Sequence, residues 1–453
     1  MHRNPDARTL ALEALEALER RDAFAEAVLN GLLSRHPSLA PRDRGLVSHL
    51  VYGVLRWRNR LDAHIAAAAT RPLAKVQPRV LQVLRLGVYQ ILFLDRVPNR
   101  AAVSESVELA RRAGLAHAAG FVNAVLRNAA ALGADLPPAD DPAERAALEF
   151  GCPRWLVEAW TAEYGQEGAV ALCRAASRIP QLWLRVHTPR AARPEAIESL
   201  RQQGFDAEEG EFGPEAVWVG AAGDPRAIDL VAAGRAVVQD QASQLIPHLV
   251  GPGRGWRILD ACAGPGLKAT HLAALGGGGT RITAVDIHPH RARMIQELAA
   301  RLGLAGIEVE VGDARRFRSS EPFDAVLADA PCSGLGVLDR NPEAKWRLGP
   351  AELAVFPPLQ LEILEGVAGS VRPGGLLVYA TCTTARAENE GVVASFLSRR
   401  PDFRLERPVE GPASRPELVS PGGYFRTFPG PSAMEGTGAL DGFFGARLRR
   451  AER

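Results

Sequence analysis

The chain has little cysteine, with five residues among 453 and no pair at CxxC spacing. An odd number of cysteines without that spacing does not form a disulfide framework or a zinc ribbon. We therefore expect reduced thiols, no metal site and a cytoplasmic location. The cysteines are Cys152, Cys173, Cys262, Cys332 and Cys382.

Long apolar runs are also missing. Membrane-spanning helices need about 18 or more consecutive apolar residues, and no such run occurs in this sequence. The first ten residues, MHRNPDARTL, do not contain the apolar core of a signal peptide. At 453 residues and 47% hydrophobic content, the chain is long enough for two or three domains. We expect a globular monomer that does not bind membranes.

Lysine is scarce, with three residues in the whole chain, so arginine supplies most of the positive charge. Residues 1–130 contain 19 Lys and Arg against 11 Asp and Glu, whereas the remainder contains 35 against 41. A basic N-terminal part on a mildly acidic body is typical of a module that binds a polyanion. Charge alone leaves open whether that polyanion is a nucleic acid.

The first 135 residues are predicted to be all-helical, because apolar residues recur at helical spacing from TLALEALEAL onward. The segments DRGLVSHLVYGVLRWRNRLD, VLRLGVYQILFLDRVPNRAAVSESVELA and GFVNAVLRN resemble the RNA-binding helical domain related to the antitermination factor NusB. That resemblance implies an RNA-binding bundle. Tyr52, Trp57 and Tyr89 are interpreted as core residues.

Two further domains are predicted after a linker that is rich in Pro, Gly and Asp, at residues 133–145. Residues 145–240 combine short strand and helix patterns, which indicates a small α+β unit, and the resemblance described below implies a ferredoxin-like fold for it. Residues 241–453 alternate strand and helix, the pattern of a doubly wound, Rossmann-like α/β sheet. Residues 401–440, rich in Pro and Gly, are expected to be mostly irregular. The strands expected in the third domain are Trp256–Asp260, Arg281–Asp286, Ile307–Val311, Phe323–Asp329, Leu376–Ala380 and Phe443–Leu448.

The segment RILDACAGPGLKATHL is predicted to be a strand, a glycine-bearing turn and a helix start. Gly264 and Gly266 allow a ligand to approach the backbone closely, and the helix N-terminus offers free N–H groups. Asp286 ends the next strand, where a carboxylate can accept hydrogen bonds from ribose hydroxyls. Asp313, after the third strand, is a candidate acceptor for an adenine amino group. Together these residues predict a nucleoside site, which would also suit NAD.

Two apolar runs, FDAVLADAPC and LLVYATC, each end in a turn that carries a cysteine. Ligands of open α/β sheets bind beyond the carboxyl ends of the strands, so Cys332 and Cys382 are predicted to lie at the active edge. Two thiols suit methylation of cytosine C5, which needs a thiolate to add to C6 and a base to remove the C5 proton. Lys268 or Arg386 is expected to favour the thiolate, and Asp329 to share a proton with N3 of the base.

The motifs DACAGPGLK, VDIHPHR, VGDARRF, LADAPCSGLGVLDRNPEAKW, LVYATCTTARAENE and DGFFGARL resemble those of RNA (cytosine-5-)-methyltransferases that use S-adenosylmethionine. With the helical domain, they indicate an enzyme acting on small-subunit (16S) ribosomal RNA. The resemblance implies that Cys382 is the nucleophile and that Cys332 assists proton removal and release of the adduct. The donor site would comprise Cys262, Ala263, Gly264, Pro265, Gly266, Leu267, Lys268, Asp286, Asp313 and Asp329. Leu267 departs from the family pattern, which has a second glycine there, and it puts the contacts to the methionine end of the donor in doubt.

The RNA substrate is expected to present an unpaired or flipped cytosine in a loop. Arg340, Lys345, Trp346 and Arg347 are candidates for holding phosphates and stacking a base, although Trp346 packed as core is the alternative. Two other functions remain open. A DNA cytosine methyltransferase would use Cys332 as the nucleophile, and an RNA-binding assembly factor would have no catalytic activity.

Overall fold

The structure, a computed structural model, describes residues 6–20, 23–220, 224–408, 410–429 and 440–452. The chain divides into two compact units. The helical unit comprises Met1–Ile179 and Leu338–Gly349, and the catalytic unit comprises Pro180–Val337 and Pro350–Arg453. The short segment Leu338–Gly349 therefore belongs to the helical unit, although both of its neighbours in sequence belong to the catalytic unit.

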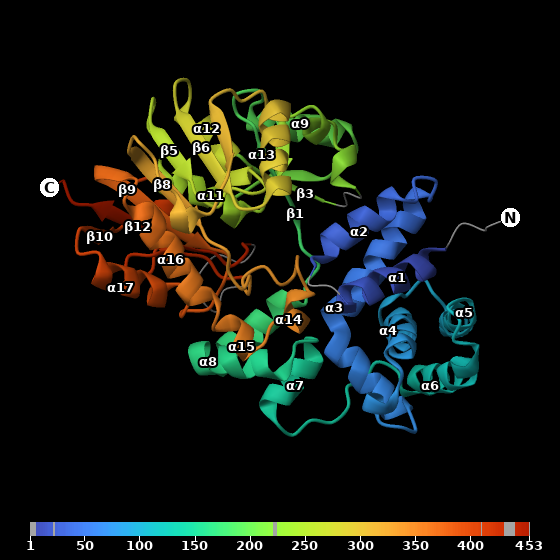
Figure 1. Cartoon of the computed structure of the whole chain (residues 1–453). Helices are drawn as coiled ribbons and strands as arrows, with labels where there is room; N and C mark the ends of the chain where they lie inside the picture. The colour runs from blue at the N-terminus through green and yellow to red at the C-terminus, as the bar shows by residue number, and fades with distance from the viewer. Residues whose placement is uncertain (1–5, 21–22, 221–223, 409, 430–439, 453) are drawn as a thin grey trace. The chain divides into compact units, whose positions relative to one another are not determined.

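The helical unit confirms the all-helical prediction for the N-terminal part (Figure 1). Its helices are α1 (Ala7–Arg20), α2 (Ala25–Ser34), α3 (Pro41–Ala68), α4 (Pro78–Phe93), α5 (Asn99–Arg112), α6 (Ala119–Leu132), α7 (Pro142–Glu149), α8 (Arg154–Ala176) and α14 (Ala344–Arg347). Helices α7 and α8 belong to this unit, which continues to Ile179.

Close contact between α3 and α4 shows why the bundle needs a glycine. A Cβ placed on Gly53 would lie 2.0 Å from a ring carbon of Tyr89, so only glycine fits there. The Tyr89 ring stacks on Phe93, and Phe93 stacks on Trp57. Tyr89 is buried, and Tyr52 and Trp57 pack against the same core, which confirms that these aromatic residues serve packing.

The catalytic unit begins with a small antiparallel sheet of strand order β2-β3-β1-β4. Its elements are β1 (Leu182–Val186), α9 (Arg193–Gln202), β2 (Ala207–Glu209), β3 (Ala216–Val219), α10 (Asp229–Ala232) and β4 (Ala236–Val238). The apolar side chains of these strands pack against Ile197 and Leu200 of α9. Each of the short strand patterns predicted for this region is confirmed.

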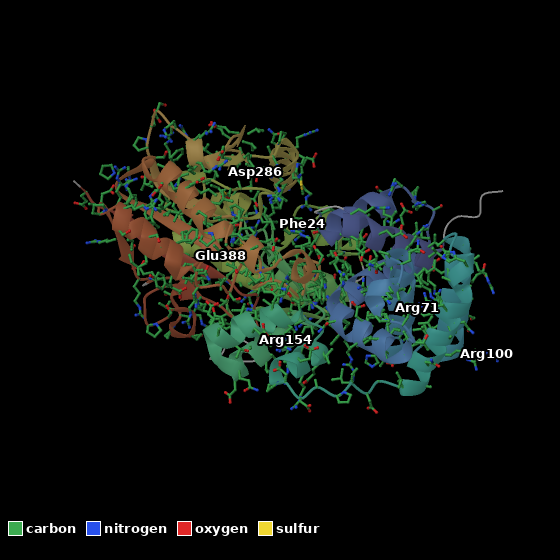
Figure 2. All side chains as sticks on the ribbon, turned by 60° about the horizontal axis from the view of Figure 1, so that its bottom comes forward. Phe24, Arg71, Arg100, Arg154, Asp286 and Glu388 are labelled. Carbon is green, nitrogen blue, oxygen red and sulfur yellow. The ribbon has the colours of Figure 1, made fainter. Side chains whose placement is uncertain are left out.

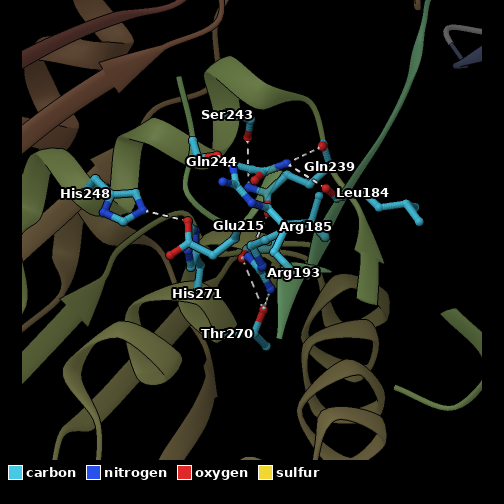
Figure 3. Close-up of polar contacts among 12 residues, drawn as sticks. Leu184, Arg185, Arg193, Glu215, Gln239, Ser243, Gln244, His248, Thr270 and His271 are labelled. Carbon is cyan, nitrogen blue, oxygen red and sulfur yellow. Dashed lines mark hydrogen bonds and ion pairs between the residues drawn. The ribbon is translucent and has the colours of Figure 1, made fainter. Parts of the chain in front are cut away.

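A buried ionic cluster joins this small sheet to the helices that follow it (Figure 3). Glu215 lies 2.9 Å from Nε2 of His248 and 3.7 Å from Nε2 of His271. Burial and the charge of Arg185 lower the pKa of His271 to about 3. Arg185, itself buried, donates to the side chains of Gln239 and Thr270. The charges of Arg185 and Glu215 attract each other within this cluster.

The large sheet carries the chemistry, with strand order β10-β12-β9-β8-β5-β6-β7 and β11 paired to β12. Strands β5 to β9 are parallel, and β12 joins β9 antiparallel (Figure 1). The strands are β5 (Arg257–Asp260), β6 (Arg281–Asp286), β7 (Ile307–Val311), β8 (Phe323–Asp329), β9 (Val371–Thr381), β10 (Phe403–Glu406), β11 (Phe425–Arg426) and β12 (Phe444–Arg450). All six predicted strands are present.

Helices cover both faces of this sheet, as the doubly wound prediction requires. Ala325 and Leu327 of β8 face one core, whereas Val326 and Ala328 face the other, because side chains alternate along a strand. The helices are α11 (Gln241–Val250), α12 (Leu267–Gly276), α13 (Pro289–Leu302), α15 (Pro350–Leu353), α16 (Phe356–Ala368) and α17 (Glu390–Arg399).

The prediction of a mostly irregular segment at residues 401–440 is confirmed for its described part. Two short strands, β10 and β11, lie in it and pair with β12, which satisfies backbone groups that a loop would leave to water. Residues 430–439 lie outside the described residues. Among the helices that the structure describes, none combines the length and the apolar character needed to cross a bilayer.

Candidate active site

The two cysteine turns lie side by side because β8 and β9 are neighbouring parallel strands. Asp329 pairs with Ala380 at their carboxyl ends, and Cys332 and Cys382 follow directly beyond. Their Sγ atoms are 3.3 Å apart, and both thiols are free and half-buried. The structure therefore brings together the two cysteines that the sequence places 50 positions apart.

Backbone hydrogen bonds hold the two turns against each other. The amide of Gly336 donates to the carbonyl of Cys382 at 3.0 Å, and the amide of Gly442 donates to Gly336 at 2.8 Å. A Cβ on Gly336 would lie 2.0 Å from the carbonyl oxygen of Gly442, so glycine is required where these segments meet. The motifs SGLG and DGFF, distant in sequence, thus form one support for the Cys332 turn.

Lys268 and Asp329 form an ion pair beside the thiols. Nζ of Lys268 donates to Oδ2 of Asp329 at 2.6 Å, and the side chains are 12% and 26% exposed. Burial lowers the pKa of Lys268, but the charge of Asp329, their hydrogen bond and the charge of the Cys382 thiolate outweigh it, so the pKa is raised. The lysine stays positively charged close to Cys382, where it favours an anionic sulfur.

The surroundings of the two thiols differ. The hydrogen bond to Cys382 and burial both raise the pKa of Cys332 well above its usual value. The charge of Cys382 acts on Lys268, so a cation lies near that sulfur.

The donor loop after β5 is shaped by its glycines and by Asp286. The amide of Gly264 donates to Oδ2 of Asp286 at 3.0 Å, and the amide of His288 donates to Oδ1 at 2.8 Å. A Cβ on Gly264 would lie 2.4 Å from Oδ2 of Asp286. Gly266 has φ +105°, a conformation that favours glycine, and it precedes α12. The loop and this carboxylate are thus fixed to one another.

Asp260 is a residue of this loop to which the sequence assigned no role. It ends β5, is wholly buried, and its oxygens make no hydrogen bond of normal geometry within the described part of the chain. Burial and the charge of Asp329 raise its pKa to about 7, although Lys268 opposes them. An orphaned buried carboxyl is satisfied by a donor from a ligand, so the loop fits a ligand with hydroxyl or amino groups. Asp260 is the last residue of β5, and this position at a strand end is the sequence signal that could have identified it.

The remaining donor-loop candidates lie as neighbours around Gly264. The amide of Ala263 donates to Val285 of β6 at 2.9 Å, and burial raises the pKa of Cys262. Leu267 packs against Val237, Leu298 and Leu302. Its bulk is thus accommodated by α13 and β4, whereas the effect of this residue on the contacts to the methionine end of the donor stays a prediction. Pro265 completes the loop between the two glycines.

Asp313 is engaged with its own neighbour. Its side chain accepts a hydrogen bond from the amide of Arg315 at 3.0 Å, and the Arg315 guanidinium donates to both carboxylate oxygens. This bidentate pair lowers the pKa of Asp313. A contact from Asp313 to an adenine amino group stays a prediction. In such a contact the carboxylate would accept from the adenine and from Arg315 at once.

Lys345 does not have the role predicted for it. It is 1% exposed, and its ammonium donates to the carbonyls of Arg56 at 2.7 Å and Gly151 at 3.1 Å. The predicted phosphate contact is therefore wrong, because the charge is buried inside the helical unit. Trp346 follows the alternative prediction, that it packs as a core residue. Its Nε1 donates to the carbonyl of Leu55 at 2.6 Å, and its ring packs against the helical core.

Arg340 and Arg347 are both half-buried in the helical unit. The guanidinium of Arg347 lies 4.9 Å from the centre of the Phe24 ring, while the amide of Arg340 donates to Oδ1 of Asp339 at 2.9 Å. RNA contacts by these two arginines stay a prediction.

The sheet is doubly wound, with a glycine loop after one strand and a fixed aspartate after the next. This arrangement is typical of an enzyme that binds a nucleoside. Three family models match the chain: NusB family over residues 5–131, the ferredoxin-like domain of RsmF/B-like methyltransferases over residues 152–224, and 16S rRNA methyltransferase RsmB/F over residues 248–449. The chain belongs to the ribosomal RNA small subunit methyltransferase B family.

Relatives cover nearly the whole chain. It is 37% identical to a probable ribosomal RNA small subunit methyltransferase B of Bacillus subtilis, over 91% of this chain and 92% of that protein. The similar protein of Synechocystis is 34% identical, over 98% and 99%. The solved structure of the protein PH0851 has the same fold, with a TM-score of 0.81 at 24% identity over 99% of this chain and 100% of that one.

Proposed function

We propose that the protein methylates C5 of one cytosine in 16S ribosomal RNA, with S-adenosylmethionine as the donor and a covalent link between Cys382 and C6. The observation that carries this proposal is the pair of sulfurs 3.3 Å apart beside Lys268 and Asp329. Pairing of a thiolate with a protonated thiol suits a reaction that needs first a nucleophile and then a base.

The donor, when bound in the loop at residues 262–268, supplies an electrophilic methyl group. Asp260 and Asp286 offer carboxylates to its polar groups, and the glycine backbone allows its close approach. Asp329 has a second task. Sharing a proton with N3 of the cytosine, it offsets the negative charge that develops when the thiolate adds to C6.

Cys382 and Cys332 act in sequence. The Cys382 thiolate bonds to C6, and the electron pair of the C5–C6 double bond forms a bond from C5 to the methyl group. The methyl–sulfur bond of the donor would break in the same step, and its electron pair would stay on the sulfur. The sulfur of Cys382 is then a thioether, so the thiolate that raised the pKa of Cys332 no longer exists. Cys332 can release its proton to solvent and remove the C5 proton. The electrons of that C–H bond restore the double bond and expel Cys382.

The target must be an unpaired or flipped cytosine, because C5 and C6 have to face the donor and the thiols at once. Exposed arginines on the helical unit, among them Arg71 and Arg100, offer positive charge to the RNA backbone (Figure 2). The relatives' names state ribosomal RNA as substrate, which favours this proposal over a DNA target.

The test is to trap the covalent intermediate on RNA that contains 5-azacytidine. Cys382→Ala should abolish the adduct and reduce methylation by at least about 10⁴-fold. Cys332→Ala should still form the adduct and should let it accumulate on ordinary RNA. Adduct formation by Cys382→Ala together with its loss in Cys332→Ala would instead assign the nucleophile to Cys332 and refute the proposal.

A further inference from the structure

Glu388 is a buried acid that the mechanism above does not use. It lies just before α17, in the motif ARAENE, and is 1% exposed. Figure 2 labels it in the catalytic unit. A carboxyl group is rarely buried so completely without a purpose, because removing it from water is costly unless hydrogen bonds replace the water. Its partners therefore indicate what it does.

The hydrogen-bond partners of this carboxyl group belong to the two cysteine turns or support them. Oε2 accepts from the Ser333 amide at 2.9 Å and from Nε2 of Gln360 at 2.9 Å. Oε1 accepts from the hydroxyl of Ser333, and from that of Thr383 at 3.4 Å. Gln360 also donates to the carbonyl of Pro331 at 3.0 Å. Obligatory N–H donors on Oε2 hold the carboxyl group in one orientation.

Ser333 and Thr383 are the residues that directly follow the two cysteines. Their hydroxyl oxygens are 2.7 Å apart, so the two residues that follow the thiols form a hydroxyl pair. Both hydroxyls contact the same Glu388 oxygen, Oε1. The Ser333 amide belongs to the planar peptide that begins at Cys332. A hydrogen bond to that amide therefore fixes the peptide plane from which the Cys332 side chain extends.

Asn389 extends the same clamp to the Cys382 turn. It accepts from the hydroxyl of Thr381 at 2.6 Å and donates to the carbonyl of Thr383 at 3.0 Å. The hydroxyl of Tyr379 in β9 donates to the Glu388 carbonyl at 2.6 Å, which anchors the clamp to the strand. The residues that precede α17 thus contact both turns.

We propose that Glu388 is a positioning residue that holds the Cys332 turn in register with Cys382, so that Cys332 reaches the C5 proton of the adduct. This inference rests on the proposed function. Removing Glu388 should impair release of the adduct more than its formation, because the Cys382 turn keeps its own contacts through Asn389. A displacement of about 1 Å in a reacting group costs on the order of 100-fold in rate.

The experiment compares Glu388→Ala with Glu388→Gln in single-turnover reactions on ordinary RNA. Glu388→Ala should slow product release about 100-fold and accumulate the covalent adduct, with adduct formation within about tenfold of wild type. Glu388→Gln can still accept from the amide of Ser333 and should lose at most about tenfold. Donor affinity, measured by calorimetry, should be unchanged in both variants. A purely structural role would lower all these quantities together.

Double variants decide whether Glu388 acts through Cys332. Glu388→Ala combined with Cys332→Ala should release product no more slowly than Cys332→Ala alone, since residues that act as one unit are not additive. If Glu388→Ala does not fold, Ser333→Ala takes its place, because it removes only the hydroxyl link and should slow release about tenfold. Wild-type release by both Glu388→Gln and Ser333→Ala would then overturn the inference.

The two proposals fail in different ways. Absence of any adduct in wild type and in Cys332→Ala would overturn the proposed function. If the cysteine variants behave as expected but Glu388→Ala turns over without accumulating adduct, the Glu388 inference alone is refuted. Loss of adduct formation as large as the loss of release would also refute it.

Discussion

Lys268 and Lys345 are both buried lysines, but their surroundings give them opposite properties. Lys268 meets the carboxylate of Asp329 and its pKa is raised. Lys345 meets backbone carbonyls, and burial lowers its pKa. A lysine paired with a carboxylate keeps its positive charge in the site, whereas a lysine held by neutral carbonyls links two segments of the chain. We therefore expect substitution of Lys268 to affect chemistry and substitution of Lys345 to affect stability.

The largest expected effect concerns Lys268. Lys268→Met leaves Asp329 without its countercharge and removes the cation near Cys382, so we expect adduct formation to fall about 10³-fold. Lys268→Arg, which keeps the charge, should recover part of that loss. The measurement is the single-turnover rate of adduct formation with saturating donor. Near-normal rates in Lys268→Met would mean that the thiolate does not depend on this cation.

A smaller effect is expected at Lys345, and on stability instead of chemistry. Lys345→Met leaves the carbonyls of Arg56 and Gly151 without this donor and should lower the free energy of unfolding by about 2 kcal/mol. The urea midpoint should fall, while the rate of adduct formation by the folded protein should be unchanged. If Lys345→Met instead reduced RNA affinity and left stability unchanged, the result would support the predicted phosphate contact, which the structure contradicts.

Deletion of the N-terminal helices is a poor substitute for that variant. Removing residues 1–130 would expose the apolar face of Trp346 and leave Lys345 without the Arg56 carbonyl. Any loss of RNA binding would then be mixed with damage to the segment Leu338–Gly349. Point variants keep the helical unit intact and separate the two effects.

Per pH unit, the smallest expected effect is the change in stability that comes from Asp260, which lies near Lys268. Its pKa is about 7 when folded, against an ordinary 3.8. Between these values the folded state binds the proton more tightly, so this contribution to stability falls as pH rises from about 4 to 7. The stability of wild type relative to Asp260→Asn should decline by at most about 1.4 kcal/mol per pH unit. Urea titrations at pH 5, 6 and 7 measure it, and parallel curves would contradict the raised pKa.

Sequence reasoning predicted much of the site because its signals are local or topological. Apolar runs located β8 and β9, and parallel strands present their carboxyl ends at the same edge, so Cys332 and Cys382 had to lie near each other. Glycine turns likewise located the donor loop. The same reasoning did not identify Glu388, because the role of a buried acid depends on which hydrogen-bond donors surround it in the fold.

The sequence by itself determined the helical, α+β and doubly wound regions and the order of the reactive residues, since hydrophobic periodicity and turn chemistry act over a few positions. Which partner each of the two lysines meets depends on the tertiary structure. The Lys345 contact joins residues 289 positions apart, and the Lys268 contact joins residues 61 apart. No local pattern encodes such partners, because burial and charge compensation arise when distant segments pack together.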